Sequence, residues 1–248
     1  MRLRDRTAIV TGAAQGFGYG MAETFLREGA RVALLDINGE AAEKAAQALG
    51  GEAKAFRCDV ANSEEVARVT GEVIASFGSL DILVNNAGTT HRNRPMLEVR
   101  EEEFDRIFAV NVKSIYLFAH AVVPHFRERG RGVILNIGST AGLRPRPGLT
   151  WYNASKGAVN LLSKSMAIEL ASDKIRVNAI APVAGDTPLL ASFMGEDTPE
   201  KRAAFQATIP WGRLSTAQDI ANAALFLCSD EAEMVTGAVL TVDGGRCI

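Results

Sequence analysis

The segment Thr7-Ala8-Ile9-Val10-Thr11-Gly12-Ala13-Ala14-Gln15-Gly16-Phe17-Gly18 determines the fold expected for this chain. Its apolar start predicts a buried strand, its glycines predict a tight turn, and the apolar spacing from Met21 to Leu26 predicts a helix. A second apolar run, Arg31 to Leu35, predicts the next strand and ends on Asp36. The start of the chain therefore predicts a βαβ unit with a glycine-rich turn after its first strand.

The glycine spacing in this turn differs from the pattern G-x-G-x-x-G but meets the same physical need. Gly12 permits the tight turn, while Gly16 and Gly18 leave room for a pyrophosphate to approach the backbone and the helix N-terminus. Gln15 and Phe17 lie between these glycines and are candidate contacts. An ordinary strand-to-helix loop is the alternative interpretation of the turn taken alone.

Asp36 at the end of the second strand favours a dinucleotide, because its carboxylate can accept hydrogen bonds from both hydroxyls of an adenosine ribose. The same carboxylate repels the 2′-phosphate of NADP, which usually needs a compensating cation nearby. The two natural positions for that cation are occupied by Gln15 and Ile37, which are neutral. The sequence therefore predicts NAD in preference to NADP.

Apolar runs and helical patterns alternate through the rest of the chain. Seven strands separated by helices predict an α/β fold: one domain, residues 1–248, built on a doubly wound parallel sheet with helices on both faces. Ser63 is expected to cap one helix, and another is expected to run from Glu101 to Arg129. The further expected strands cover 53–58, 81–84, 132–137, 175–180 and 239–242.

Polar or special residues follow several of these expected strands. Ligands of such sheets bind beyond the carboxyl ends of the strands, which meet at one edge. We therefore expect a site at that edge, formed by the residues that end the strands: Asp36, Asp59, Asn85, Ser139 and Pro182.

The segment Tyr152-Asn153-Ala154-Ser155-Lys156 places a phenol and an ammonium on one face of an expected helix. A positive charge within ~4–6 Å lowers the tyrosine pKa from about 10, so the pair could exchange a proton with an alcohol near neutral pH. The two residue types are common on helices, and the spacing alone is compatible with chance. The expected dinucleotide at the same edge supplies a reaction for the pair.

The composition excludes several classes of partner. The 248 residues are 47% hydrophobic and 23% charged, which is ordinary for a soluble protein, and the net charge of −2 gives no reason to expect nucleic acid or membrane. Cys58, Cys228 and Cys247 are too scattered for a metal site or a disulfide framework. We therefore expect a cytoplasmic protein with no metal, no nucleic-acid partner and no membrane partner.

Taken jointly, five motifs resemble those of the short-chain dehydrogenase/reductase family. They are Thr11-Gly12-x-x-x-Gly16-x-Gly18, Asn85-Asn86-Ala87-Gly88, Asn111, Ser139 and Tyr152-x-x-x-Lys156, and the resemblance extends to Asp243-Gly244-Gly245. It implies a Rossmann-type sheet, a nicotinamide cofactor and hydride transfer to or from a carbonyl.

The resemblance also implies roles for single residues. Tyr152 would be the general acid/base, Lys156 would lower its pKa and bind the nicotinamide ribose, and Ser139 would hold the substrate oxygen. Asn111 would help position a water chain from Lys156 to solvent. Cofactor contacts are implied at Asp59, Val60, Asn86, Ala87, Gly88, Pro182, Val183 and Thr187.

One departure from the family pattern concerns the end of the sixth strand. The family usually has Pro-Gly there, whereas this chain has Pro182-Val183-Ala184-Gly185. The displaced glycine puts Val183 and Thr187 in doubt as cofactor contacts.

Three segments are expected to line the substrate site: one after Gly88, one between Ser139 and Tyr152, and a lid at 186–212. The first two carry several cations, which motivates the hypothesis of an anionic or strongly polar small-molecule substrate. The alternative is that these cations are solvated or bind a neighbouring subunit. The candidate substrate residues are Ser139, Tyr152, His91, Arg94 and Arg144.

The function expected from these features is hydride transfer between NAD(H) and a secondary alcohol or ketone. An NADPH-dependent 3-oxoacyl-carrier-protein reductase is the enzymatic alternative, and a cofactor-sensing regulator is the non-enzymatic one. The presence of Ser139, Tyr152 and Lys156 argues against the regulator. The family resemblance also implies a homotetramer, and the helices around Asn111 and Tyr152 are apolar beyond one face.

Overall fold

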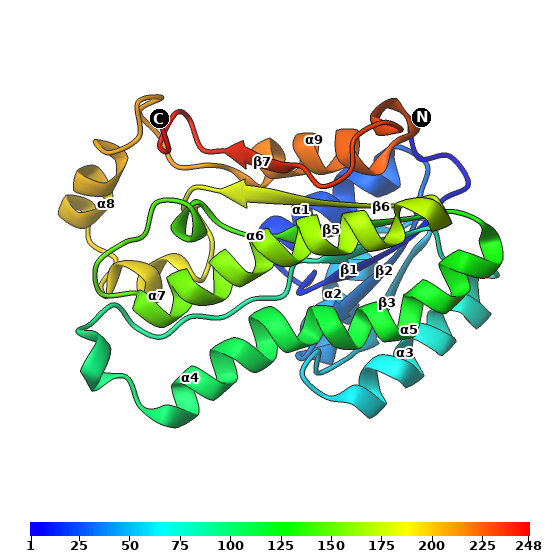
Figure 1. Ribbon diagram of the computed structural model, residues 1–248, viewed down its shortest axis with the longest axis horizontal. Helices are drawn as coiled ribbons and strands as arrows, with labels where there is room; N and C mark the ends of the chain where they lie inside the picture. The colour runs from blue at the N-terminus through cyan, green and yellow to red at the C-terminus, as the bar shows by residue number, and fades with distance from the viewer.

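A computed structural model describes residues 1–248 and contains one seven-stranded parallel sheet in the order β3-β2-β1-β4-β5-β6-β7 (Figure 1). The predicted α/β fold with a doubly wound, Rossmann-type parallel sheet is confirmed. The strand order reverses between β1 and β4, which is where such sheets bind ligands. The strands are β1 (Thr7–Thr11), β2 (Arg31–Asp36), β3 (Ala53–Arg57), β4 (Ile82–Asn85), β5 (Gly132–Ile137), β6 (Ile175–Pro182) and β7 (Val239–Val242).

Helices cover both faces of the sheet (Figure 1). Side chains alternate along each strand, so Ala8 and Val10 pack with the α1 and α9 side while Ile9 packs with the α3, α5 and α6 side. The α-helices are α1 (Gly16–Arg27), α2 (Gly39–Leu49), α3 (Ser63–Phe77), α4 (Glu101–Phe108), α5 (Ser114–Arg129), α6 (Thr150–Leu170), α7 (Leu190–Met194), α8 (Pro199–Gln206) and α9 (Ala217–Cys228).

The cap of α3 differs from the prediction. The side chain of Asn62 accepts hydrogen bonds from the backbone N–H groups of Glu64 and Glu65, and Ser63 is the first helical residue. Asparagine and serine are comparably good caps, so two adjacent candidates could not be separated by residue type.

The predicted helix from Glu101 to Arg129 is continuous but contains a π-helical turn at Ala109–Lys113 between α4 and α5. By length and composition alone this run could cross a membrane, since an 18-residue window has a mean hydropathy of 1.5. In this fold, however, Phe118, Val122 and Phe126 of α5 are fully buried in the core. Core packing therefore accounts for part of the apolar composition of this helix.

The segment 186–212, expected from the sequence to be a lid, contains two short helices, α7 and α8. Their apolar residues Leu190, Phe193 and Phe205 form a small buried cluster together with Tyr152. This cluster attaches the segment to the start of α6.

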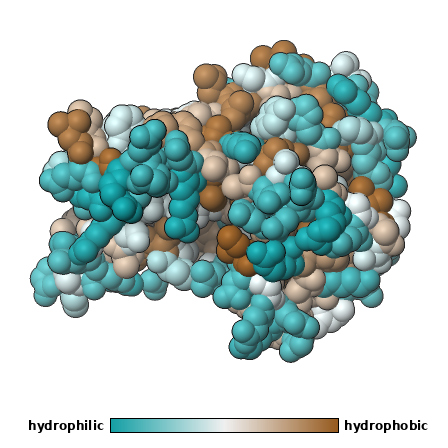
Figure 2. Space-filling model, turned by 90° about the horizontal axis from the view of Figure 1, so that it is seen from below, coloured by the Kyte–Doolittle hydropathy of each residue, from teal (hydrophilic) through white to brown (hydrophobic).

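Several large apolar side chains remain exposed. They include Tyr116 on α5, Leu161 and Ile168 on α6, and Leu240 on β7. On the face seen from below, apolar residues form separate patches among hydrophilic ones (Figure 2).

Candidate active site

A cleft of 770 Å³ opens at the carboxyl ends of the strands, beside the point where the strand order reverses. Most of the predicted site residues line it, although they come from segments far apart in the chain. They are Gly12, Gln15, Gly16, Phe17, Asp36, Ile37, Asp59, Val60, Asn86, Ala87, Gly88, Ser139, Tyr152, Lys156, Pro182, Val183 and Thr187.

The glycine-rich turn is shaped for close approach to the backbone. Gly12 and Gly16 have φ angles of 61° and 59°, which favour glycine. A Cβ on Gly18 would lie 2.3 Å from the carbonyl oxygen of Gly12, so Gly18 serves the packing beneath the turn and does not line the cleft. Gln15 precedes α1 without a side-chain cap, which leaves backbone N–H groups of the first turn available to an anion.

Asp36, the last residue of β2, holds its carboxylate in the wall of the cleft. Its oxygens accept hydrogen bonds from the backbone N–H groups of Ala14, at 3.2 Å, and Asn38, at 3.0 Å. Next to it, Ile37 is 61% exposed and neutral. The position of this carboxylate is therefore fixed by the backbone.

Asn86 joins the end of β4 to the glycine turn. Its side-chain amide donates to the carbonyl oxygens of Thr11 and Gly12, and its backbone N–H donates to the Thr11 hydroxyl at 2.9 Å. The Asp59 carboxylate accepts from the backbone N–H of Ala61 at 2.9 Å. The Asn86 bonds hold one wall of the cleft to the end of β1, whereas the Asp59 bond lies within the loop that follows β3.

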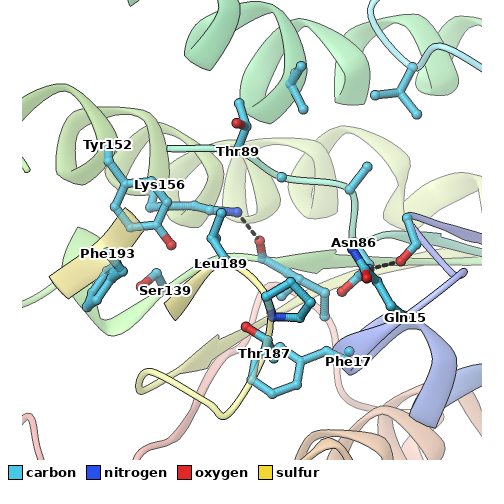
Figure 3. A pocket seen from close by; sticks show the side chains of 18 of the residues that line it. Gln15, Phe17, Asn86, Thr89, Ser139, Tyr152, Lys156, Thr187, Leu189 and Phe193 are labelled. Carbon is cyan, nitrogen blue, oxygen red and sulfur yellow. Dashed lines mark hydrogen bonds between the residues drawn. The ribbon is translucent and has the colours of Figure 1, made fainter. Parts of the chain in front are cut away.

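Tyr152 and Ser139 bring two buried hydroxyl groups to the same part of the cleft (Figure 3). Burial raises the pKa of Tyr152 to about 12, and the nearby Ser139 hydroxyl acts in the opposite direction. The Ser139 oxygen also accepts from the backbone N–H of Ala141 at 3.0 Å, which orients this hydroxyl.

Lys156 lies one turn further along α6, with its ammonium nitrogen 6.0 Å from the centre of the Tyr152 ring. The nitrogen donates to the Ile137 carbonyl oxygen at 2.8 Å, and burial lowers the pKa of Lys156 to about 8. In the protein alone, burial of the phenol dominates the pKa of Tyr152, and the lowering of this pKa by Lys156 stays a prediction. The desolvation of the phenol outweighs the attraction of an ammonium directed at the backbone.

Asn111 does not line the cleft but lies behind it, in the π-helical turn. Its amide accepts from the Thr89 N–H at 2.8 Å and donates to the Thr89 oxygen at 2.9 Å and to the Ser155 hydroxyl at 3.0 Å. A Cβ built on Gly88 would be 3.5 Å from the Asn111 oxygen and 3.4 Å from the Lys156 nitrogen. Both polar groups therefore converge on Gly88.

The segment with the displaced glycine still lines the cleft, from Pro182 to Gly185. A Cβ on Gly185 would lie 2.3 Å from the ring of Phe17, so this glycine admits the ring. A Cβ on Gly16 would lie 3.4 Å from the Thr187 methyl group, which places Thr187 across the cleft mouth from the glycine turn.

Three predicted substrate residues lie outside the cleft lining. Arg94 forms an ion pair with Glu103. Exposed Arg144 donates to the Arg246 carbonyl oxygen at 2.6 Å. His91 is buried, with Nδ1 bonded to the Arg92 oxygen at 2.9 Å and Nε2 without a partner.

Part of the cleft wall was not predicted from the sequence. Thr89 and Ile137 flank predicted residues and could have been found from their neighbours at the strand ends. Phe193 comes from α7, and its ring meets the Tyr152 ring edge to face with the ring centres 5.7 Å apart (Figure 3). No local motif marks this contact. The other unpredicted lining residues are Cys58, Ala61, Arg106, Ala109, Val110, Gly138, Ala184, Gly185, Pro188, Leu189 and Leu190.

These features fit a dinucleotide cofactor. The glycine turn with its uncapped helix N-terminus suits a pyrophosphate, and the fixed Asp36 carboxylate suits the hydroxyls of a ribose. No group of three or more His, Cys, Asp or Glu side chains is arranged to hold a metal ion. Fold and cleft together define a nucleotide-binding protein of the Rossmann type.

Comparison with known proteins identifies the family. Residues 12–246 match the family model described as enoyl-(acyl carrier protein) reductase. The chain belongs to the short-chain dehydrogenase/reductase family, whose members are oxidoreductases acting on alcohol and ketone groups.

Similar proteins cover the full chain. A 4-formylbenzenesulfonate dehydrogenase from Comamonas testosteroni is 48% identical over 100% of both chains. A 2-(R)-hydroxypropyl-CoM dehydrogenase from Xanthobacter autotrophicus is 40% identical over 97% of this chain and 98% of its own. The crystal structure of a 3-ketoacyl-(acyl-carrier-protein) reductase from Brucella melitensis, complexed with NADH, superposes with a TM-score of 0.94 at 46% identity, covering 99% of this chain and 100% of the other.

Proposed function

We propose that this protein transfers a hydride between NAD(H) and a secondary alcohol or ketone, with Tyr152 as the general acid/base. The observation that carries the proposal is the pair of buried hydroxyls of Tyr152 and Ser139 in one cleft, with Lys156 one helical turn away. The nicotinamide cofactor supplies the hydride chemistry when bound. The protein orients the substrate and moves its proton.

The roles of the three residues follow from their contacts. Ser139 has its hydroxyl oriented by Ala141 and holds the substrate oxygen next to the Tyr152 phenol. Tyr152 is protonated at neutral pH in the protein alone, since its pKa is raised to about 12, and it gives this proton to a ketone. In the oxidation of an alcohol, the positive charge of Lys156 stabilises the tyrosinate that accepts the proton. Asn111 holds Thr89 and Ser155 in place and supports a proton path from Lys156.

NAD is the proposed cofactor, with NADP less favoured. The fixed carboxylate of Asp36 and the neutral Gln15 and Ile37 support this choice, and the similar reductase from Brucella melitensis was crystallised with NADH. We assign the cofactor contacts to the cleft residues predicted from the sequence. Gly18 supports the turn from beneath.

The principal alternative is a 3-oxoacyl-carrier-protein reductase, which the name of the 46% identical solved structure favours. Asp36 disfavours the NADPH dependence expected for that activity. A cofactor-sensing regulator is disfavoured by the joint presence of Ser139, Tyr152 and Lys156 in the cleft.

An anionic small molecule is the proposed substrate class. The relative that is 48% identical is named for 4-formylbenzenesulfonate, which combines a carbonyl with an anionic group. The proposed lid, residues 186–212, contributes Leu190 and Phe193 to the cleft beside Tyr152. A single catalytic domain, a homotetrameric assembly and a cytoplasmic location complete the proposal.

The test is turnover by the purified protein of a panel of secondary alcohols and ketones, hydroxy acids and acyl thioesters, each with both cofactors. We expect NAD-dependent oxidation of at least one alcohol and a loss of most of this turnover in Tyr152→Phe. Turnover confined to acyl thioesters with NADPH would favour the reductase alternative. Cofactor binding without turnover anywhere in the panel would favour the regulator.

A further inference from the structure

Two arginines that lie outside the cleft lining each have a buried guanidinium nitrogen without a hydrogen-bond partner. They are Arg146, in the chain segment that joins Ser139 to Tyr152, and Arg246, near the C-terminus. The unpartnered atom is Nη1 in both. The only other charge that acts appreciably on Arg146 is that of Arg246. Buried donors are normally satisfied, so two unpartnered donors in neighbouring guanidinium groups indicate that an acceptor belongs between or beside them.

Aromatic rings connect Arg146 to the proposed reaction centre. Its guanidinium carbon is 4.0 Å from the centre of the Phe205 ring and 4.9 Å from that of Phe193. The Phe193 ring contacts Tyr152 and lines the cleft. One phenylalanine ring therefore separates the guanidinium of Arg146 from the phenol of Tyr152.

Arg246 is held in place by its neighbours. Arg144 donates to its carbonyl oxygen at 2.6 Å and fixes the C-terminal turn against the segment that carries Arg146. The acid of this turn, Asp243, accepts from the backbone N–H groups of Gly245 at 3.0 Å and Cys247 at 2.9 Å. This carboxylate is therefore engaged by backbone and forms no ion pair with either guanidinium.

We infer that Arg146 and Arg246 form a binding site for the anionic end of the substrate, a carboxylate or a sulfonate on a flat, aromatic body. Such a body suits the cleft wall at Phe193, and its carbonyl or alcohol then lies at Tyr152 and Ser139. A planar guanidinium binds both oxygens of such an anion. The inference rests on the proposed function and names its substrate class.

The charge of the site persists at working pH. Burial, and secondarily the charge of Arg246, lowers the pKa of Arg146 to about 10, which leaves it protonated near neutrality. The rings that contact Arg146 come from α7 and α8, so access of the anion to Arg146 requires these helices to shift. Arg144 is then a positioning residue for Arg246.

The test compares 4-(1-hydroxyethyl)benzoate with 1-phenylethanol, two secondary alcohols that differ only by a carboxylate. With NAD, we expect the wild-type protein to prefer the carboxylate, and Arg146→Met to lower kcat/KM for it about tenfold, mainly through KM. Methionine keeps an apolar side chain packed against the rings of Phe193 and Phe205. The kcat/KM of Arg146→Met for 1-phenylethanol should stay within about twofold of the wild-type value. Arg4→Met, at an exposed arginine remote from the cleft, is the control and should stay within the same limit on both substrates.

Binding separates this inference from the proposed reaction. Isothermal titration of the NAD⁺ complex with the ketones 4-acetylbenzoate and acetophenone measures the preference without turnover, because the oxidised cofactor has no hydride to give to a ketone. A preference for 4-acetylbenzoate that Arg146→Met and Arg246→Met both reduce supports the anion site even if neither alcohol is oxidised. Equal losses on the charged and uncharged ligands, or no wild-type preference, would overturn it and assign Arg146 to the packing of α7 and α8.

Discussion

The carboxylate of Asp36 accepts a hydrogen bond of 3.2 Å from the backbone N–H of Ala14, across the top of the βαβ unit. The bond links the end of β2 to the turn that follows β1, and it fixes the carboxylate in the wall of the cleft. The proposed preference for NAD is thereby tied to a carboxylate that a backbone contact holds in place.

Replacing this carboxylate should change the cofactor preference. Asp36→Ala combined with Ile37→Arg removes the repulsion of a 2′-phosphate and adds a cation. The kcat/KM for NADP should therefore rise and the kcat/KM for NAD should fall. A hydrogen bond to a charged group contributes about 1.5–3 kcal/mol, so the ratio of kcat/KM values should shift by at least tenfold. The exposed Asp105→Ala is the control. A wild-type protein that already prefers NADP would contradict the assignment.

Tyr152→Phe should abolish most turnover while leaving cofactor binding intact. The change removes the proton donor but keeps the ring that packs on Phe193. We expect kcat to fall by about 10²–10⁴ and the Kd for NADH, measured by fluorescence, to change little. Ser139→Ala should lower kcat less, because it removes the polarising hydroxyl and leaves the acid. Unchanged turnover in both variants would place the chemistry elsewhere.

The pH dependence of stability should report the burial of Lys156. Its pKa is lowered to about 8 in the folded protein, whereas the pKa of lysine in an unfolded chain is about 10.4. Between these values the unfolded chain binds more protons, so the cost of the buried charge is full below pH ~8 and is relieved as the pH rises to ~10.4. Lys156→Met should therefore stabilise the cofactor-free protein more at pH 7 than at pH 10.

Urea unfolding at the two pH values measures this difference. The exposed Lys164→Met on the same helix is the control and should show no such trend. If the stabilisation by Lys156→Met, measured as free energy of unfolding, grew with pH, it would contradict a lowered pKa for Lys156 in the folded protein.

Asn93 should control the closure of the proposed lid. Its backbone N–H donates to the Ser192 oxygen at 2.9 Å, and its side chain donates to the oxygens of Pro147 at 3.1 Å and Phe193 at 3.4 Å. Asn93→Ala loses the side-chain bonds and should raise KM several-fold and speed proteolysis within 186–212. Arg127→Ala, at an exposed ion pair away from this segment, is the control. Equal proteolysis of all three proteins would contradict the role.

The sequence predicted what is encoded locally at the ends of strands. Asp36, Asn86 and Ser139 each follow an apolar run that must be a buried strand, and parallel strands end at one edge, so their meeting could be foreseen. Phe193 could not be foreseen, because its contact with Tyr152 depends on how α7 folds over the site.

The arginines show the same limit. Charge counting could not distinguish Arg94, which pairs with Glu103, from Arg146, whose guanidinium packs against two aromatic rings. Nor could it foresee the π-helical turn that directs Asn111 at Thr89, since the flanking pattern is that of an ordinary helix. Tertiary packing decides these environments, and one-dimensional spacing carries little of that information.

The proposed homotetramer should depend on exposed apolar residues of α5, α6 and β7. Ile168 on α6 is 81% exposed and Tyr116 on α5 is 60% exposed, although both helices bury their opposite sides in the core. Burying such side chains against a second copy recovers about 25 cal/mol per Å² of apolar surface. Ile168→Glu places a charge in that contact and should reduce the particle mass in light scattering. Glu169→Gln on the same helix should leave the mass unchanged, and a monomeric wild-type protein would contradict the proposal.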